Sequence, residues 1–272
     1  MPDEFVFHIR NAQPGDMVAA LATLEVYPGL STITEIVEHA ETLGFTIRDR
    51  QRLEALMTVR DLGLVAREQN VLTSNGKVLT QLEMDKPDLF ADVVHGLQYV
   101  LWDDKQPSAY CFSWSYRKLC QMLWQSGVTT LTSRREIASE IEAQARTVFG
   151  RSDIAFSPKS IGGALLWLSE LKPSVLDESG KKFNRRTFCP PELFVLAVDF
   201  VYSTQGVDYG ANLLLSDEHR DAICQVCLLD PSGFDRVLEY VVTQFDYLEK
   251  GLGGGWGRYL TLRHGPMVEE FV

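Results

Sequence analysis

The stretch DLGLVAREQNVLTSNGKVL at residues 61–79 decides the fold of the chain. A helical pattern of apolar side chains ends within it, and the period then changes to one that predicts two short strands, at residues 64–68 and 71–73. The polar pair Gln69-Asn70 between these strands is typical of a tight turn. Residues 73–76, Thr-Ser-Asn-Gly, then favour the start of another helix.

Three helices are predicted before this stretch. Residues 14–26, 32–43 and 48–62 each place apolar side chains at helical spacing, and Gly44 is a natural stop for the second helix. The chain therefore passes through three helices, a small hairpin and a fourth helix within about 70 residues.

This order, with one local motif, resembles the winged-helix domain of bacterial transcription regulators over residues 14–82. The motif consists of Leu62-Gly63-Leu64-Val65, then Leu72-Thr73, then Gly76. The resemblance implies a winged-helix fold and does not imply a target. The expected wing is only a few residues long, and Arg67 is its one basic residue, which is little for contact with a minor groove.

The middle of the chain repeats the expected order of helices followed by a hairpin. This second unit comprises a helix at 116–130, helices that begin at Ser133 and Ser157, and a hairpin of residues 175–176 and 183 onward around a turn at 178–180. Ser133 has capping-box spacing to Glu136, and Ser157 stands before a proline at the first helical position.

The C-terminal part of the chain predicts a third unit. The apolar residues 190–206 form a buried helix in this interpretation, and residues 247–249 pair with 258–262 across the glycine-rich loop 251–257. The predicted domains are therefore an N-terminal winged-helix domain at 1–104, a second winged-helix-like unit at 105–190 and a C-terminal helical unit at 191–272. The predicted fold class is mainly α with small β-hairpins (α+β), with tandem winged-helix-like units packed into one body.

The charge is distributed unevenly along the sequence. The whole chain carries a formal net charge of −11, but residues 116–190 hold 12 Lys and Arg against 7 Asp and Glu, whereas residues 191–272 hold 5 against 13. A polyanion would meet the basic middle, and the acidic end fits protein partners better.

Basic side chains in the predicted units are the candidate DNA contacts. Cations in a wing or at a helix start neutralise phosphates and release counterions. The candidates are Lys181, Lys182, Arg185 and Arg186 in the second wing, Lys159 at a helix start, Arg134 and Arg135 on the preceding helix, and Arg48 and Arg52 on the predicted recognition helix of the first unit. The alternative is that these are ordinary solvated or ion-paired side chains, and both interpretations stay open.

No motif predicts a catalytic, metal or cofactor site. The five cysteines are odd in number and stand in apolar context, so we expect reduced, buried thiols. Cys224-x-x-Cys227 lacks the second ligand pair of a zinc site. The glycine-rich loop lacks the ending of a phosphate loop, so we expect a hairpin tip at which Trp256 and Arg258 are candidates for partner contact.

Two functions remain from these observations. No apolar run is long enough to cross a bilayer and no signal peptide is visible, so we expect a cytoplasmic protein without membrane contact. The first hypothesis is a non-enzymatic DNA-binding protein that contacts duplex DNA mainly through phosphates. The second is a winged-helix protein-interaction subunit of a larger bacterial DNA-processing or phage-defence complex, with protein partners at the acidic C-terminal region. Either hypothesis is compatible with an oligomer, and an enzyme with an unrecognised site is the remaining alternative.

Overall fold

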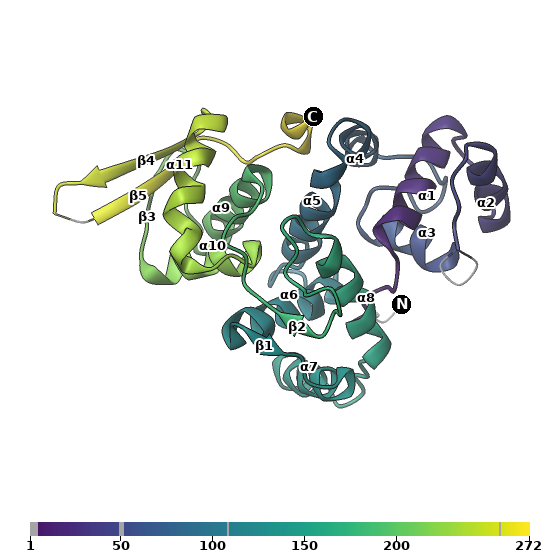
Figure 1. Ribbon diagram of the computed structural model, residues 1–272, viewed down its shortest axis with the longest axis horizontal. Coiled ribbons are helices and arrows are strands. Elements are labelled where there is room, and N and C mark those ends of the chain that lie inside the picture. Colours follow the sequence, from purple (N-terminus) through teal and green to yellow (C-terminus); the bar gives the residue numbers. More distant parts are fainter. Residues whose placement is uncertain (1–4, 49–51, 108, 256) are drawn as a thin grey trace. The chain divides into compact units, whose positions relative to one another are not determined.

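The structure is a computed structural model that describes residues 5–48, 52–107, 109–255 and 257–272 (Figure 1). The chain is mainly helical with two small antiparallel sheets, as the sequence predicted. It forms two compact units. Unit 1 contains residues 1–119, 131–171 and 272, and unit 2 contains residues 120–130 and 172–271. These units divide the chain differently from the three consecutive domains that the sequence predicted, because the chain leaves unit 1 and returns to it.

Unit 1 begins with the predicted helices. They are α1 (Pro14–Val26), α2 (Ile33–Thr42), α3 (Arg52–Asp61), α4 (Ser74–Asp85) and α5 (Pro87–Val100). Thr32 and Glu35 form a reciprocal capping box at the start of α2, which explains why the helix begins there. The predicted start of α3 at residues 49–51 lies outside the described residues.

The hairpin expected after α3 is reduced to one antiparallel bridge between Val65 and Leu72. Asn70 turns the chain with a φ of 49°, and its side-chain amide donates to the carbonyl of Leu30 at 2.8 Å. Thr73 caps α4 through its hydroxyl, which accepts from the Gly76 N–H at 3.2 Å. The order of elements predicted for residues 14–82 is therefore present, with a shorter hairpin than the sequence indicated.

Three more helices follow, named α6 (Cys111–Ser126), α7 (Arg134–Phe149) and α8 (Pro158–Glu170). The capping box of Ser133 and Glu136 starts α7, and Ser157 caps α8, both as predicted. The buried guanidinium of Arg117 donates to the carbonyls of Tyr99 and Trp102 at 3.0 and 2.9 Å, which satisfies the C-terminal end of α5.

The small sheet of unit 2 pairs β1 (Thr129–Thr130) with β2 (Lys182–Phe183) in antiparallel register. Leu176 bridges Phe183 on the other side of β2, so the hairpin predicted around residues 178–180 is confirmed. The carboxylate of Asp177 accepts the backbone N–H groups of Lys181 and Lys182 at 2.8 and 3.0 Å and fixes this turn.

The rest of unit 2 builds a second, larger sheet against three helices. Its elements are α9 (Pro191–Gln205), β3 (Asn212–Leu214), α10 (Asp217–Cys227), the 3₁₀ turn η2 (Pro231–Gly233), α11 (Phe234–Gln244), β4 (Leu248–Gly253), β5 (Gly257–Leu262) and the 3₁₀ turn η3 (Val268–Phe271). The strand order is β3-β5-β4. The predicted buried helix and the predicted C-terminal hairpin are confirmed, and Figure 1 shows the hairpin extending beyond the helices of its own unit.

Two segments of the chain share one order of elements. From α6 to β2, and again from α9 to β5, the chain runs through a helix, a strand, two helices and two extended segments. In both segments the first strand pairs with the last one, β1 with β2 and β3 with β5. No helix in the described part of the chain has the length and apolar character needed to cross a membrane.

Candidate functional site

The predicted recognition helix of the first unit, α3, lines a cleft of unit 1 with part of its surface, whereas Leu53 near its start is 61% exposed. Met57, Arg60 and Asp61 of α3 line a cavity of about 710 Å³ together with residues 6 and 10 and part of the segment 106–112. The carboxylate of Asp61 accepts from Arg10 at 2.9 Å. A helix reads bases by entering a major groove about 12 Å wide, so the side of α3 that lines this cleft is not free to make such contacts unless the cleft opens.

The corresponding helix of the second winged-helix-like unit that the sequence predicted is α8, which belongs to unit 1 of the structure. It is buried along most of its length. Its residues from Ser160 to Leu165 are buried, as are Trp167 and Leu168. Ser160 shares a 3.0 Å hydrogen bond with His8, and a side chain at Gly163 would come within 2.4 Å of the Arg10 carbonyl. Other residues of the same chain therefore cover the face of α8 that a recognition helix would turn toward DNA.

The two arginines predicted to contact DNA from the first unit have structural positions. The guanidinium of Arg48 donates twice to the carboxylate of Asp16, at 3.2 and 2.6 Å, and Asp16 is 2% exposed. This pair neutralises a buried carboxylate of α1, while the Arg48 side chain is still 48% exposed, so its DNA contact stays a prediction. Arg52 is half-buried at the start of α3.

Two of the four basic residues of the predicted second wing also pack within unit 2. Arg186 is 4% exposed and donates to the carbonyls of Cys227 and Lys172 at 2.7 and 3.2 Å. The guanidinium of Arg185 lies 4.2 Å from the ring centroid of Trp124 and donates to its carbonyl at 2.8 Å. The DNA contact predicted for Arg186 is therefore corrected, because its buried guanidinium holds the fold. Arg185 is half-buried and stacked on Trp124, and its DNA contact stays a prediction.

The remaining candidates are exposed cations. Lys181 and Lys182 lie at the turn in unit 2, and Arg134 and Arg135 lie in the first turn of α7 in unit 1. Lys159 is exposed at the start of α8, where its ammonium lies 3.7 Å from Glu54. The division into units places these cations in two separate bodies, so the single basic segment of the sequence does not amount to one basic body.

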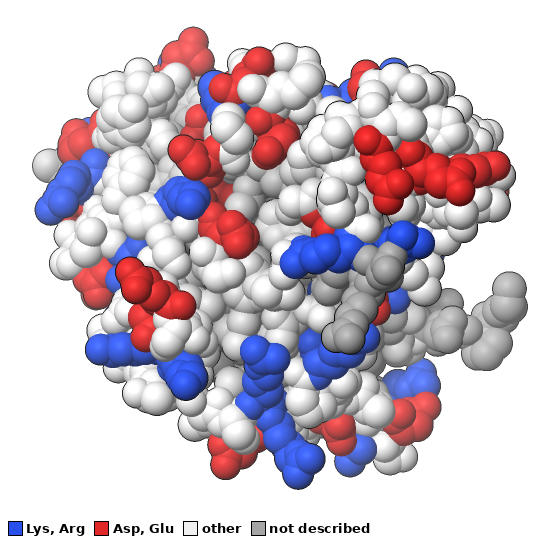
Figure 2. All heavy atoms as spheres, turned by 45° about the vertical axis from the view of Figure 1, so that its right-hand side comes forward, with Lys and Arg blue, Asp and Glu red and all other residues white. Residues whose placement is uncertain are grey.

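Each unit has an excess of acidic residues. Unit 1 holds 16 Lys and Arg against 22 Asp and Glu, a net charge of −6, and unit 2 holds 10 against 15, a net charge of −5. On the face shown in Figure 2, Lys and Arg side chains occur in short groups separated by Asp, Glu and uncharged residues. Such a mixture gives a weak field for attracting a polyanion.

The hairpin and α11 form a different kind of surface in unit 2. Cations on the hairpin are paired with carboxylates: Lys250 with Glu239, Arg258 with Asp235 at 2.8 Å, and Arg263 with Glu249. Between them, Leu252 is 79% exposed and Tyr240 of α11 is 47% exposed. We call α11 with β4 and β5 the hairpin surface. Arg258, a predicted partner contact, is used in one of these pairs, and Trp256 lies outside the described residues.

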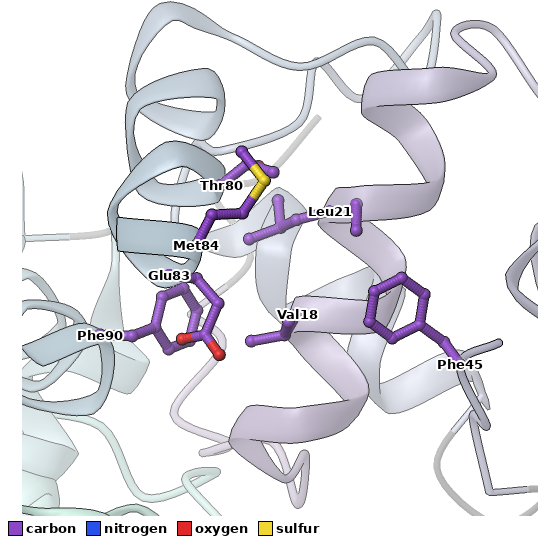
Figure 3. Close-up of a pocket in the computed structure, with 8 residues that line it drawn as sticks. Val18, Leu21, Phe45, Thr80, Glu83, Met84 and Phe90 are labelled. Carbon is purple, nitrogen blue, oxygen red and sulfur yellow. The ribbon is translucent and has the colours of Figure 1, made fainter. Parts of the chain in front are cut away.

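An apolar pocket in unit 1 was not visible from the sequence (Figure 3). It has a volume of about 260 Å³ and lies among α1, α4, the start of α5 and Phe45. Val18 and Leu21 point toward Met84, and the carboxylate of Glu83 lies beside Phe90 at the same wall. Burial, and to a lesser degree Asp88, raises the pKa of Glu83. The pocket therefore combines apolar walls with one carboxyl that burial disfavours in its charged form.

The cysteines have the environment that the sequence predicted. All five are free and buried. Burial raises the pKa of Cys111 to about 11 and that of Cys224 to about 12, so these thiols stay protonated at neutral pH. Within the described residues, no group of three His, Cys, Asp or Glu side chains could hold a metal ion.

Comparisons with protein-family models, curated proteins and solved structures find no match for this chain. The assignment of function therefore depends on the geometry described above.

Proposed function

We propose that the chain is a cytoplasmic, non-enzymatic protein-interaction subunit built from winged-helix-like units, and that it acts within a larger DNA-processing assembly. The order of elements supports the winged-helix interpretation. Helix, strand, two helices and two strands, with the first strand paired to the last, occurs twice downstream of the segment that carries the winged-helix motif. The buried, reduced thiols favour a cytoplasmic location.

One observation carries the choice of protein over DNA. In the winged-helix interpretation α3 and α8 are the recognition helices, and α3 lines a cleft of unit 1 while α8 is buried along most of its length. A winged-helix unit whose recognition helix is covered keeps its fold and loses its usual route to the major groove. Such a unit is suited to a structural or docking role.

The hairpin surface is the region of unit 2 that best fits a protein partner. Lys250 and Arg258 of this surface are paired with carboxylates of α11, and the same elements carry an exposed leucine and an exposed tyrosine. Apolar and tyrosine side chains that are surrounded by paired charges are typical of the centre and rim of protein interfaces. We therefore expect Leu252 and Tyr240 to contact the partner.

Affinity purification of the tagged full chain from its own cells tests this proposal. We expect a defined partner to be retained by the native chain and by Lys181→Glu/Lys182→Glu, and to be lost from Leu252→Glu/Tyr240→Glu. The double-lysine variant is the matched control, since it also changes two exposed residues of unit 2. The proposal is contradicted if Leu252→Glu/Tyr240→Glu retains the partner and Lys181→Glu/Lys182→Glu loses it.

DNA binding is the second candidate function. The observation that favours it is the pair Lys181 and Lys182, which are exposed on a turn that Asp177 holds in place. If both lysines neutralise phosphates, the slope of log affinity against log salt changes by about 2 in Lys181→Gln/Lys182→Gln. Fluorescence anisotropy with a labelled duplex at several salt concentrations measures this slope. An unchanged slope, or no binding at low salt, contradicts DNA binding through these lysines and leaves protein interaction as the one proposed function.

A further inference from the structure

The cleft in unit 1 that α3 lines together with Val6, Arg10, Gln106 and residues 109–112 carries several arginines. Arg10, Arg60 and Arg67 face a volume of about 710 Å³, and Asp61 is the acidic side chain among the described residues that line it. The cleft therefore has two positive charges in excess within a unit whose net charge is −6. A concave, positively charged site concentrates field lines and attracts anions.

The carboxylate of Asp61 uses only part of the hydrogen-bonding capacity of these arginines. It accepts from the Nε of Arg10 and from one Nη of Arg67, each at 2.9 Å. Arg60 donates to the side-chain oxygen of Asn70. Among the described residues, no acceptor takes the Nη groups of Arg10 or the Nε of Arg67. A guanidinium has five N–H donors in a planar fork, so these groups remain available to a ligand that presents a phosphate or a carboxylate.

The opposite wall of the cleft is aromatic and apolar. Tyr110 and Phe112 line it with their ring centroids 6.1 Å apart, and Met57 of α3 faces the same cavity. Tyr110 is 44% exposed, so its ring is accessible from the cleft. A flat aromatic group packs well on such a wall, and cavities of about 300–1,000 Å³ hold small ligands.

We propose that this cleft binds a free nucleotide, with its phosphates on Arg10 and Arg67 and its base against Tyr110. A nucleoside diphosphate supplies both groups that the cleft complements, an anion for the guanidinium donors and an aromatic ring for the apolar wall. The site is independent of the hairpin surface, because its residues belong to unit 1.

Isothermal titration calorimetry on the full chain at low ionic strength tests the proposal. The probes are ADP, GDP, CDP and UDP, pyrophosphate, and adenosine. We expect at least one nucleotide to bind, pyrophosphate to bind more weakly, and adenosine to bind least. Arg67→Gln lowers the affinity for both the nucleotide and pyrophosphate by about tenfold or more. Tyr110→Ala lowers the affinity for the nucleotide and leaves that for pyrophosphate unchanged.

The choice of variants separates binding from folding. The side chain of Arg67 is 66% exposed, so we expect Arg67→Gln to keep the melting temperature of the native chain. Arg135→Gln is the matched control, because Arg135 is exposed on α7 and outside the cleft. The proposal is overturned if no nucleotide binds at millimolar concentration. It is also overturned if folded Arg67→Gln and Tyr110→Ala bind like the native chain.

Discussion

Replacing Gly76 with alanine tests the physical basis of the motif that decides the fold. Gly76 lies in the first turn of α4, where alanine normally stabilises a helix by about 1 kcal/mol relative to glycine. A Cβ at this position would, however, lie 2.0 Å from the carbonyl oxygen of Leu64 and 3.0 Å from its carbonyl carbon. Helix propensity and packing therefore predict opposite signs for the same substitution.

The magnitude follows from the groups that must move. Ordinary contact begins near 3.4 Å, so the Leu64 carbonyl must retreat by at least about 1 Å. That carbonyl accepts from the N–H of Thr73 at 3.0 Å and from its hydroxyl at 3.2 Å. The Thr73 hydroxyl has one proton and lies closer to the Gly63 carbonyl, at 2.8 Å, so only the backbone bond to Leu64 counts in full. One weakened hydrogen bond of about 1 kcal/mol, with about 1–3 kcal/mol of overpacking, outweighs the gain in propensity. We expect Gly76→Ala to destabilise unit 1 by about 1–3 kcal/mol.

Differential scanning calorimetry of the full chain measures the effect. A loss of this size lowers the melting temperature of a unit of this length by about 2–12 °C. Gly15→Ala is the matched control, because Gly15 lies in the first turn of α1 with no atom within 4 Å of the added carbon. We expect the control to melt at or above the temperature of the native chain. A Gly76→Ala variant that melts as high as the control would refute the reasoning.

Three further predictions concern titration, thiols and buried charge. Because burial raises the pKa of Glu83 in the folded state, its ionisation costs stability as pH rises through that pKa, so Glu83→Gln should raise the melting temperature at pH 7 and leave it unchanged below pH 4; an equal effect at both values contradicts the sign. The five buried thiols should react with a water-soluble disulfide reagent only after denaturant is added, and rapid labelling of the native chain would show that a thiol is accessible. Arg186→Met should destabilise unit 2 by about 2–4 kcal/mol in urea denaturation, since it removes the donor to the buried carbonyl of Cys227 and to the part-buried carbonyl of Lys172, whereas Lys181→Met should stay within about 0.5 kcal/mol. Equal effects of the two substitutions would argue against a structural role for Arg186.

Local signals in the sequence predicted where most elements begin. Ser133, Ser157 and the motif around Thr73 fix helix starts through hydrogen bonds within three residues, so their effect does not depend on the rest of the fold. The hairpins were visible for the same reason, because the turn residues carry their own signals. Strand β3 was missed, since its three residues pair with β5 about 50 positions later and have no periodicity of their own.

The environment of charged side chains depends on contacts that the sequence does not reveal. Arg185 and Arg186 are adjacent to two exposed lysines in the sequence, yet Trp124 and Cys227 place them against the interior of unit 2. Arg10 and Asp61 are 51 positions apart, so the arginine-lined cleft could not be found from spacing. Charge counted along a segment therefore overestimates the charge that a surface presents.

The path of the chain through unit 1 has a practical consequence for anyone who divides this protein into fragments. Residues 131–171 complete the unit after an excursion of the chain through residues 120–130. A fragment cut at residue 104, the first boundary that the sequence indicates, would lose α8 and the aromatic wall formed by Tyr110 and Phe112, and would leave α3 and its arginines open to solvent. Such a fragment would expose Met57 and Arg60, which line the cleft in the intact molecule, so any binding it showed would be a property of the truncation.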